Sequence, residues 1–154
     1  MTHPTQSLFV VLEQAKSSRD HAFMLLESSR KILEDARYKL NSLHNFRQQY
    51  EERWQGQFRQ AGGMEIVRCY QDFMARLTSA VDEQAKRVEH LQRDHEMRRT
   101  DLLECERKLS AVEKLIERRQ QEMLVSTMRK EQRDTDEMAT RLALNTNKLQ
   151  APPC

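Results

Sequence analysis

The sequence contains very little glycine and proline, and both are confined to three places. The 154 residues include three glycines and three prolines, at Pro4, at Gly56, Gly62 and Gly63, and at Pro152 and Pro153. Interior glycine destabilises a helix by about 1 kcal/mol and interior proline by about 3 kcal/mol, so neither is expected inside one. Residues 5–55 and 64–151 contain no strong helix breaker, and this predicts two long helices joined by one turn.

Cysteines and long apolar runs are also scarce. Cys69 and Cys105 are separated by 36 positions on the expected second helix. This is roughly 54 Å along a helix, which excludes a disulfide between them in one monomer. An odd number of cysteines without a disulfide pattern is typical of a reducing compartment. The longest apolar run, from Leu8 to Leu12, is too short for a membrane span or a secretion signal. These features predict a soluble, cytoplasmic protein.

Aromatic residues are few, and neither sign of charge dominates. Aromatics make up 6% of the chain and charged residues 32%, with 26 basic and 24 acidic residues giving a net charge of +2. Mean hydropathy is -0.88, which leaves little material for a compact core. This composition is typical of coiled coils. Basic pairs such as Arg98 with Arg99 are interrupted by acidic residues, so no stripe for nucleic acid is expected.

Two apolar seams with a spacing of three and four residues run along the expected helices. The seam of the second helix comprises Val81, Gln84, Val88, Leu91, His95, Arg98, Leu102, Cys105, Leu109, Val112, Ile116, Arg119 and Met123. The seam of the first helix comprises Leu8, Leu12, Ala15, Arg19, Ala22, Leu26, Ser29, Leu33, Ala36, Leu40, Leu43, Arg47 and Trp54, with Phe46 and Tyr50 beside it. The spacing predicts a coiled coil formed by the two helices.

A fold back at Gly62 and Gly63 would pair residues whose numbers add to about 124. The two seams then match, with layers such as Leu8 with Ile116, Leu12 with Val112, Ala15 with Leu109, Ala22 with Leu102, Leu33 with Leu91, Ala36 with Val88, Leu43 with Val81 and Trp54 with Tyr70. Three layers pair alanine with a larger residue, which lets helices approach closely. The layers Arg19 with Cys105, Leu26 with Arg98 and Ser29 with His95 are expected to bury little and to fix the register.

The same register leaves the second helix longer than the first. Thr5 would lie opposite Arg119, so residues from Gln120 to about Leu144 have no helix of their own to pack against. The predicted fold is all-α: an antiparallel coiled-coil hairpin whose second helix overhangs at its C-terminus. The predicted bounds within this single domain, residues 1–154, are helix 1 at about 5–57, a turn at about 58–64, helix 2 at about 65–144 and a flexible tail at 145–154.

No pattern of residues indicates chemistry. The five histidines, His3, His21, His44, His90 and His95, include no pair four residues apart and none at metal-ligand spacing from a cysteine. His95 is interpreted as a polar seam residue. There is no glycine-rich phosphate loop and no recognisable nucleophile. We therefore expect no catalytic, cofactor or metal site, and a protein that is not an enzyme.

Three segments resemble the FliJ family of flagellar type III export proteins. They are Leu40-x-x-Leu43-x-x-Phe46-x-x-x-Tyr50, then Tyr70-Gln71-Asp72-Phe73-x-x-x-Leu77-x-x-Ala80 with Gln84, and Glu131-Gln132-x-x-x-Asp136-Glu137-Met138-Ala139. Together with the helical layout, the resemblance covers about Leu8 to Arg141. Phe46 stands where the family often has tyrosine, and residues 151–154 match nothing in the family pattern.

The resemblance implies a noncatalytic central stalk that couples the export ATPase ring to the membrane export gate and promotes ATPase assembly and activity. Implied partners are the hexameric flagellar export ATPase, the cytoplasmic domain of the export gate and export chaperones, with membrane association through partners only. The implied location is the cytoplasmic face of the inner membrane at the flagellar basal body, with a role in motility and chemotaxis. Expected gate contacts are Leu43, Phe46, Tyr50, Phe73, Leu77 and Ala80. Expected ATPase-ring contacts are Met123, Leu124, Met128, Gln132, Asp136, Glu137 and Met138.

Two other functions fit the same pattern of helices. A cytosolic chaperone or escort for an exported flagellar subunit would use the apolar overhang to cover its cargo. A structural coiled coil would instead self-associate through that overhang. Recovery of the export ATPase in a pull-down would distinguish the stalk from both alternatives.

Overall fold

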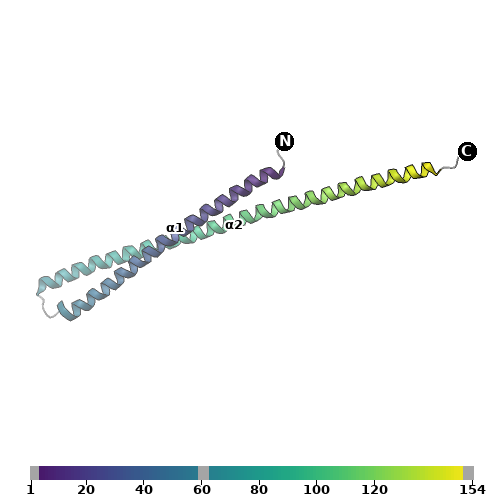
Figure 1. Cartoon of the computed structure of the whole chain (residues 1–154). Helices are drawn as coiled ribbons and strands as arrows, with labels where there is room; N and C mark the ends of the chain where they lie inside the picture. Colours follow the sequence, from purple (N-terminus) through teal and green to yellow (C-terminus); the bar gives the residue numbers. More distant parts are fainter. Residues whose placement is uncertain (1–3, 59–62, 151–154) are drawn as a thin grey trace. The chain divides into compact units, whose positions relative to one another are not determined.

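The chain folds into two long α-helices. The structure, a computed structural model, describes residues 4–58 and 63–150. Helix α1 spans Pro4–Arg53, a short π-helical turn spans Trp54–Phe58, and helix α2 spans Met64–Leu149 (Figure 1). The described ranges contain no β-strand. The prediction of an all-α hairpin of two long helices is confirmed.

The ends of the helices differ from the predicted bounds. Helix α1 ends at Arg53, and the chain continues to Phe58 as a π-helix that contains Gly56. Helix α2 continues to Leu149, beyond the predicted end at about 144, so residues 145–149 are helical rather than part of a flexible tail. No breaker occurs in α2 before Pro152, and the Thr146 hydroxyl donates a hydrogen bond to the carbonyl of Leu142 (2.9 Å).

The turn itself is only partly described. The Gly63 carbonyl accepts the first backbone hydrogen bonds of α2, from the amides of Ile66 (3.1 Å) and Val67 (3.5 Å). Gly63 therefore marks the start of the second helix, as expected of a residue just before a helix. Gly62, the other half of the predicted fold-back, lies outside the described residues, as do residues 59–61 and 151–154.

Two compact units make up the chain, and each is described by itself. The first unit, Lys16–Arg107, contains the middle of the chain. Its buried apolar side chains are Ala22, Leu33, Ala36, Leu77 and Val81, each at most 8% exposed. Every predicted seam residue in this unit is buried or half-buried. The seams were identified correctly because a spacing of three and four keeps the same helix face toward its partner.

Two pairs in this unit confirm the predicted register directly. The rings of Trp54 and Tyr70 stack with centroids 4.1 Å apart and planes 9° from parallel. The Ser29 hydroxyl lies 3.2 Å from Nδ1 of His95. The layer of Ser29 with His95 was predicted to bury little. This is wrong for Ser29, which is only 6% exposed. Its hydroxyl can be buried because it also donates a hydrogen bond to the carbonyl of Leu26 in its own helix (2.7 Å).

Other polar seam residues also form a hydrogen bond or an ion pair. The Gln84 side-chain amide donates a hydrogen bond across the helix pair to the carbonyl of Ala36 (2.9 Å). The seam arginine Arg19 directs its guanidinium to Asp20 on the surface (2.9 Å). These contacts fit the expectation that long basic side chains reach from the seam to solvent.

The second unit joins residues Met1–Ala15 with residues Lys108–Cys154. Leu109 and Ile116 of α2 are buried, whereas Leu8, Leu12 and Ala15 of α1 are half-buried. Thr5 and Leu8 line one small cavity with Met123 and Ser126, so the first turn of α1 lies beside α2 somewhat beyond the predicted Arg119. Every residue from Glu117 to Gln150 is exposed. The apolar core of this unit therefore ends at Ile116.

Candidate interaction surfaces

Aromatic side chains gather where α1 ends and α2 begins. This aromatic cluster consists of Phe46, Tyr50, Trp54, Tyr70 and Phe73. On α1 its members are four residues apart, which places them on one helix face. The rings of Tyr50 and Phe73 approach most closely across the helix pair after the Trp54–Tyr70 stack, with centroids 4.4 Å apart. Aromatic pairs of this kind contribute about 0.5–1.5 kcal/mol beyond their buried area.

A groove opens beside the aromatic cluster. It is lined by Tyr50, Trp54, Glu65, Ile66, Cys69, Tyr70 and Phe73. Partial burial raises the pKa of the Tyr70 phenol above its ordinary value, with smaller contributions from the charges of Glu51 and Tyr50. The phenol is protonated at neutral pH, as tyrosine ordinarily is, and can donate a hydrogen bond. Large rings with a polar tip, arranged around a shallow groove, are typical of protein interfaces.

The six expected gate contacts all lie in the unit that contains this cluster, but they differ in exposure. Phe46 is the most accessible, with 48% of its surface exposed. Leu43, Tyr50, Phe73 and Ala80 are half-buried. Leu77 is 8% exposed, so its side chain packs between the helices. Phe46 is thus the residue of this set that a partner reaches first, and the gate contact stays a prediction.

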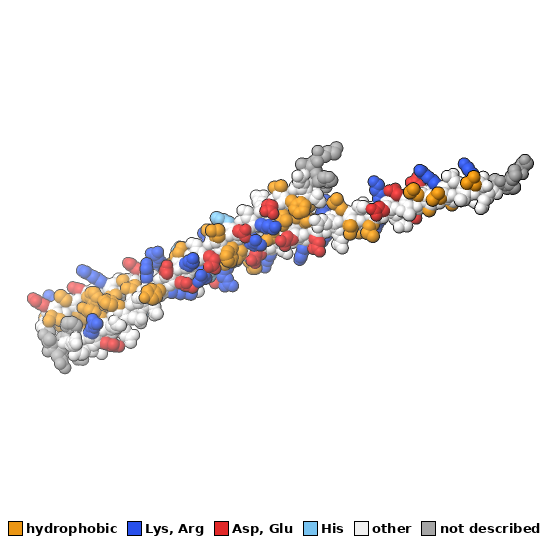
Figure 2. Space-filling model, viewed as in Figure 1, with side chains coloured by type: hydrophobic (Ala, Val, Ile, Leu, Met, Phe, Trp, Pro, Cys, Tyr) orange, Lys and Arg blue, Asp and Glu red, His pale blue; other side chains and the backbone are white. Residues whose placement is uncertain are grey.

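The expected ATPase-ring contacts all lie on the exposed C-terminal part of α2. Met123, Leu124, Met128 and Met138 are between 51% and 66% exposed. The polar members of the set are exposed and paired within the helix. Gln132 donates a hydrogen bond to Asp136 (3.3 Å), and Glu137 forms an ion pair with Arg141 (2.8 Å). Figure 2 shows hydrophobic side chains alternating with charged ones along this part of the helix.

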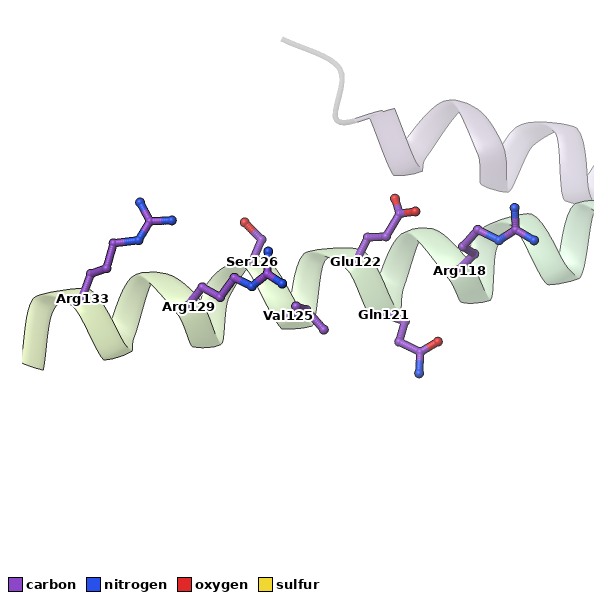
Figure 3. A pocket seen from close by; sticks show the side chains of 7 residues that line it. All are labelled: Arg118, Gln121, Glu122, Val125, Ser126, Arg129 and Arg133. Carbon is purple, nitrogen blue, oxygen red and sulfur yellow. The ribbon is translucent and has the colours of Figure 1, made fainter.

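A basic groove runs along the same part of α2. It is lined by Arg118, Gln121, Glu122, Val125, Ser126, Arg129 and Arg133, and Figure 3 shows these side chains projecting from the helix. This groove was not predicted from the sequence, in which acidic residues interrupt the basic pairs. The sequence feature that indicates the basic groove is the spacing of Arg129 and Arg133, which lie one turn apart and share a helix face.

Neither a metal centre nor a membrane-spanning helix is found in the described part of the chain. No three histidine, cysteine, aspartate or glutamate side chains of residues 4–58 and 63–150 gather closely enough to hold a metal ion. In the same ranges, no helix combines the length and hydrophobicity that a membrane crossing requires. Cys69 and Cys105 are free thiols. Among the described residues, the aromatic cluster and the C-terminal part of α2 both present exposed apolar side chains.

Comparison with known proteins identifies one family. The family described as "Flagellar FliJ protein" matches residues 5–148, which include both α1 and nearly all of α2. No curated protein and no solved structure matches the chain.

Proposed function

Because the chain belongs to the FliJ family and is therefore a component of the flagellar export apparatus, we propose that it is the noncatalytic stalk of that machine. In this proposal it couples the export ATPase ring to the membrane export gate and promotes assembly and activity of the ATPase. The family supports a structural and export role rather than catalysis.

The observation that carries the proposal is the exposed C-terminal part of α2. From Glu117 to Gln150 every residue is exposed, yet the segment includes Leu124, Met128 and Met138 at more than 60% exposure. Exposed apolar side chains on a long helix are typical of a surface that binds a partner. Flexible methionines suit such a surface because they adapt to the shape of the partner. We propose that this segment enters the pore of the hexameric ATPase.

The aromatic cluster supports the second part of the proposal. Phe46 is exposed, and the neighbouring groove is lined by Tyr50 and Phe73. Tyrosine, tryptophan and phenylalanine are favoured anchors at protein interfaces. We propose that this cluster contacts the cytoplasmic domain of the export gate. Contact with export chaperones and attachment to the inner membrane through these partners belong to the same proposal.

Co-purification with the export ATPase tests the ring contact. A chain that ends at Ser126 keeps the residues that line the cavity with Thr5 and Leu8. It should therefore remain helical, with an unchanged melting temperature for the helix pair. We expect the full chain to retain the hexameric ATPase on an affinity resin and the shortened chain to lose it.

The control is a chain in which only Leu144 is changed to Glu. Leu144 is 59% exposed but lies outside the expected ring contacts, so this variant should retain the ATPase. Retention of the ATPase by the shortened chain would exclude residues 127–150 as the ring contact, whereas Met123 and Leu124 remain in both chains. Recovery of a stable complex with one exported subunit, and no ATPase, would instead indicate a cargo chaperone.

A further inference from the structure

The C-terminal part of α2 has an apolar stripe of its own. Leu124, Met128, Met138 and Leu142 are between 61% and 66% exposed. With Glu131 and Thr135 between them, they repeat at four, three, four, three and four residues, which is the spacing of a coiled-coil seam. We call these six residues the C-terminal stripe. At about 100° per residue, the C-terminal stripe lies roughly 70° around the helix from the seam formed by Leu109 and Ile116.

The C-terminal stripe is symmetric about its centre. The numbers of Leu124 and Leu142 add to 266, as do those of Met128 and Met138, and those of Glu131 and Thr135. A two-fold axis perpendicular to the helix near Arg133 therefore brings leucine onto leucine and methionine onto methionine. Such self-complementarity is the requirement for an interface between two identical chains.

The seam residue Glu131 decides between the two orientations of such a pair. A parallel pair would place the carboxylate of Glu131 against that of its own copy, and like charges repel. An antiparallel pair places Glu131 against Thr135 of the other chain, which carries no charge.

We propose that the C-terminal stripe binds a second copy of this chain in antiparallel orientation, with the two-fold axis near Arg133. The layer at the centre joins Glu131 of one chain with Thr135 of the other. This polar layer costs stability and fixes the register. With only four apolar side chains from each copy, the dimer is weak and reversible, in the micromolar range or above.

This dimer covers residues that the stalk proposal gives to the ATPase ring. Leu124, Met128 and Met138 belong both to the C-terminal stripe and to the expected ring contacts. Self-association would therefore hold the protein in a form that cannot enter the ring. The competition rests on the proposed function, whereas the self-association does not.

Sedimentation of the full chain over a range of concentrations tests the dimer. We expect a reversible shift from monomer to dimer as concentration rises. Leu142→Glu should weaken the dimer at least about tenfold, because it places a charge against Leu124 of the other chain. The matched control is Leu144→Glu, which changes an equally exposed leucine on another face and should leave the dimer intact. A chain that stays monomeric throughout, or equal weakening by both variants, would overturn the proposal.

Disulfide trapping tests the orientation. In a chain whose three native cysteines are changed to serine, Met128→Cys and Met138→Cys are prepared separately and then mixed under mild oxidation. The antiparallel register predicts crosslinks between the two variants. It separates the two copies of position 128 by roughly 15 Å, so Met128→Cys alone should not crosslink. Efficient crosslinking of Met128→Cys with itself would indicate a parallel pair and overturn the proposed geometry.

Discussion

Ser29 of α1 and His95 of α2 are joined by a hydrogen bond whose donor can be identified. The Ser29 hydroxyl has one hydrogen, and it donates this hydrogen to the carbonyl of Leu26 (2.7 Å). The contact with Nδ1 of His95 (3.2 Å) therefore requires that Nδ1 carries a proton and donates it to the serine oxygen. One polar layer of the seam is thus satisfied on both sides.

Ser29→Ala should destabilise the helix pair by about 1 kcal/mol. The substitution removes the acceptor for His95 Nδ1 and changes little volume at a position that is 6% exposed. The free energy of unfolding, measured with urea and followed by circular dichroism, checks this value.

The matched control for this prediction is the adjacent serine. Ser28 is exposed, so Ser28→Ala should change stability by less than about 0.5 kcal/mol. Equal effects of the two substitutions would mean that helix propensity, rather than the hydrogen bond to His95, determines the result.

At the residue scale, periodicity predicted which side chains face the other helix, but not how polar ones are satisfied. Val81 and Leu109 are buried because their spacing repeats with the coiled coil. Ser29 was expected to bury little because a hydroxyl in a seam is costly without a partner. The bond that it makes within its own helix depends on side-chain rotamer, which spacing does not indicate.

At the scale of elements, the end of α1 and the start of α2 contain both buried and exposed side chains. Leu77→Ala should cost about 2–5 kcal/mol of stability, because Leu77 is buried.

Phe46→Ala should cost only about 1 kcal/mol of stability, because Phe46 is half exposed. Its ring centroid lies 6.2 Å from that of Tyr50 and 6.3 Å from that of Phe73. If the aromatic cluster contacts the export gate, Phe46→Ala should weaken gate binding at least about tenfold.

The control for the gate contact is Tyr38→Ala. Tyr38 is 75% exposed on the same helix but lies outside the aromatic cluster, so gate affinity should not change. Titration of the purified gate domain by calorimetry, with melting curves for each variant, separates binding from folding. Loss of gate affinity only in proportion to loss of stability would show that Phe46 serves packing alone.

The bounds of the elements were predicted less well than their number. The scarcity of glycine and proline correctly indicated two helices, since both residues destabilise helix interiors. Gly56 was expected to lie inside helix 1, but the chain adopts a π-helical turn from Trp54 to Phe58. The tail was predicted from residue 145, whereas helix geometry continues to Leu149 because nothing before Pro152 interrupts its hydrogen bonds.

At the scale of the whole molecule, two surfaces of different character belong to two units of the chain. The aromatic cluster lies in the unit Lys16–Arg107, and the C-terminal part of α2 lies in the other. The membership in the FliJ family accounts for the presence of such a chain in the flagellar export apparatus. The sequence indicated both surfaces through the resemblance, but exposure was needed to distinguish Phe46 from the buried Leu77.

The rate of ATP hydrolysis by the purified export ATPase shows whether the C-terminal part of α2 acts on the ring. The stalk proposal predicts that the full chain raises this rate, that Leu124→Glu reduces the stimulation at least about tenfold, and that Leu144→Glu leaves it unchanged. Leu124 and Leu144 are 62% and 59% exposed, so both variants should remain helical. A full chain that leaves the hydrolysis rate unchanged, or equal stimulation by both variants, would contradict the account.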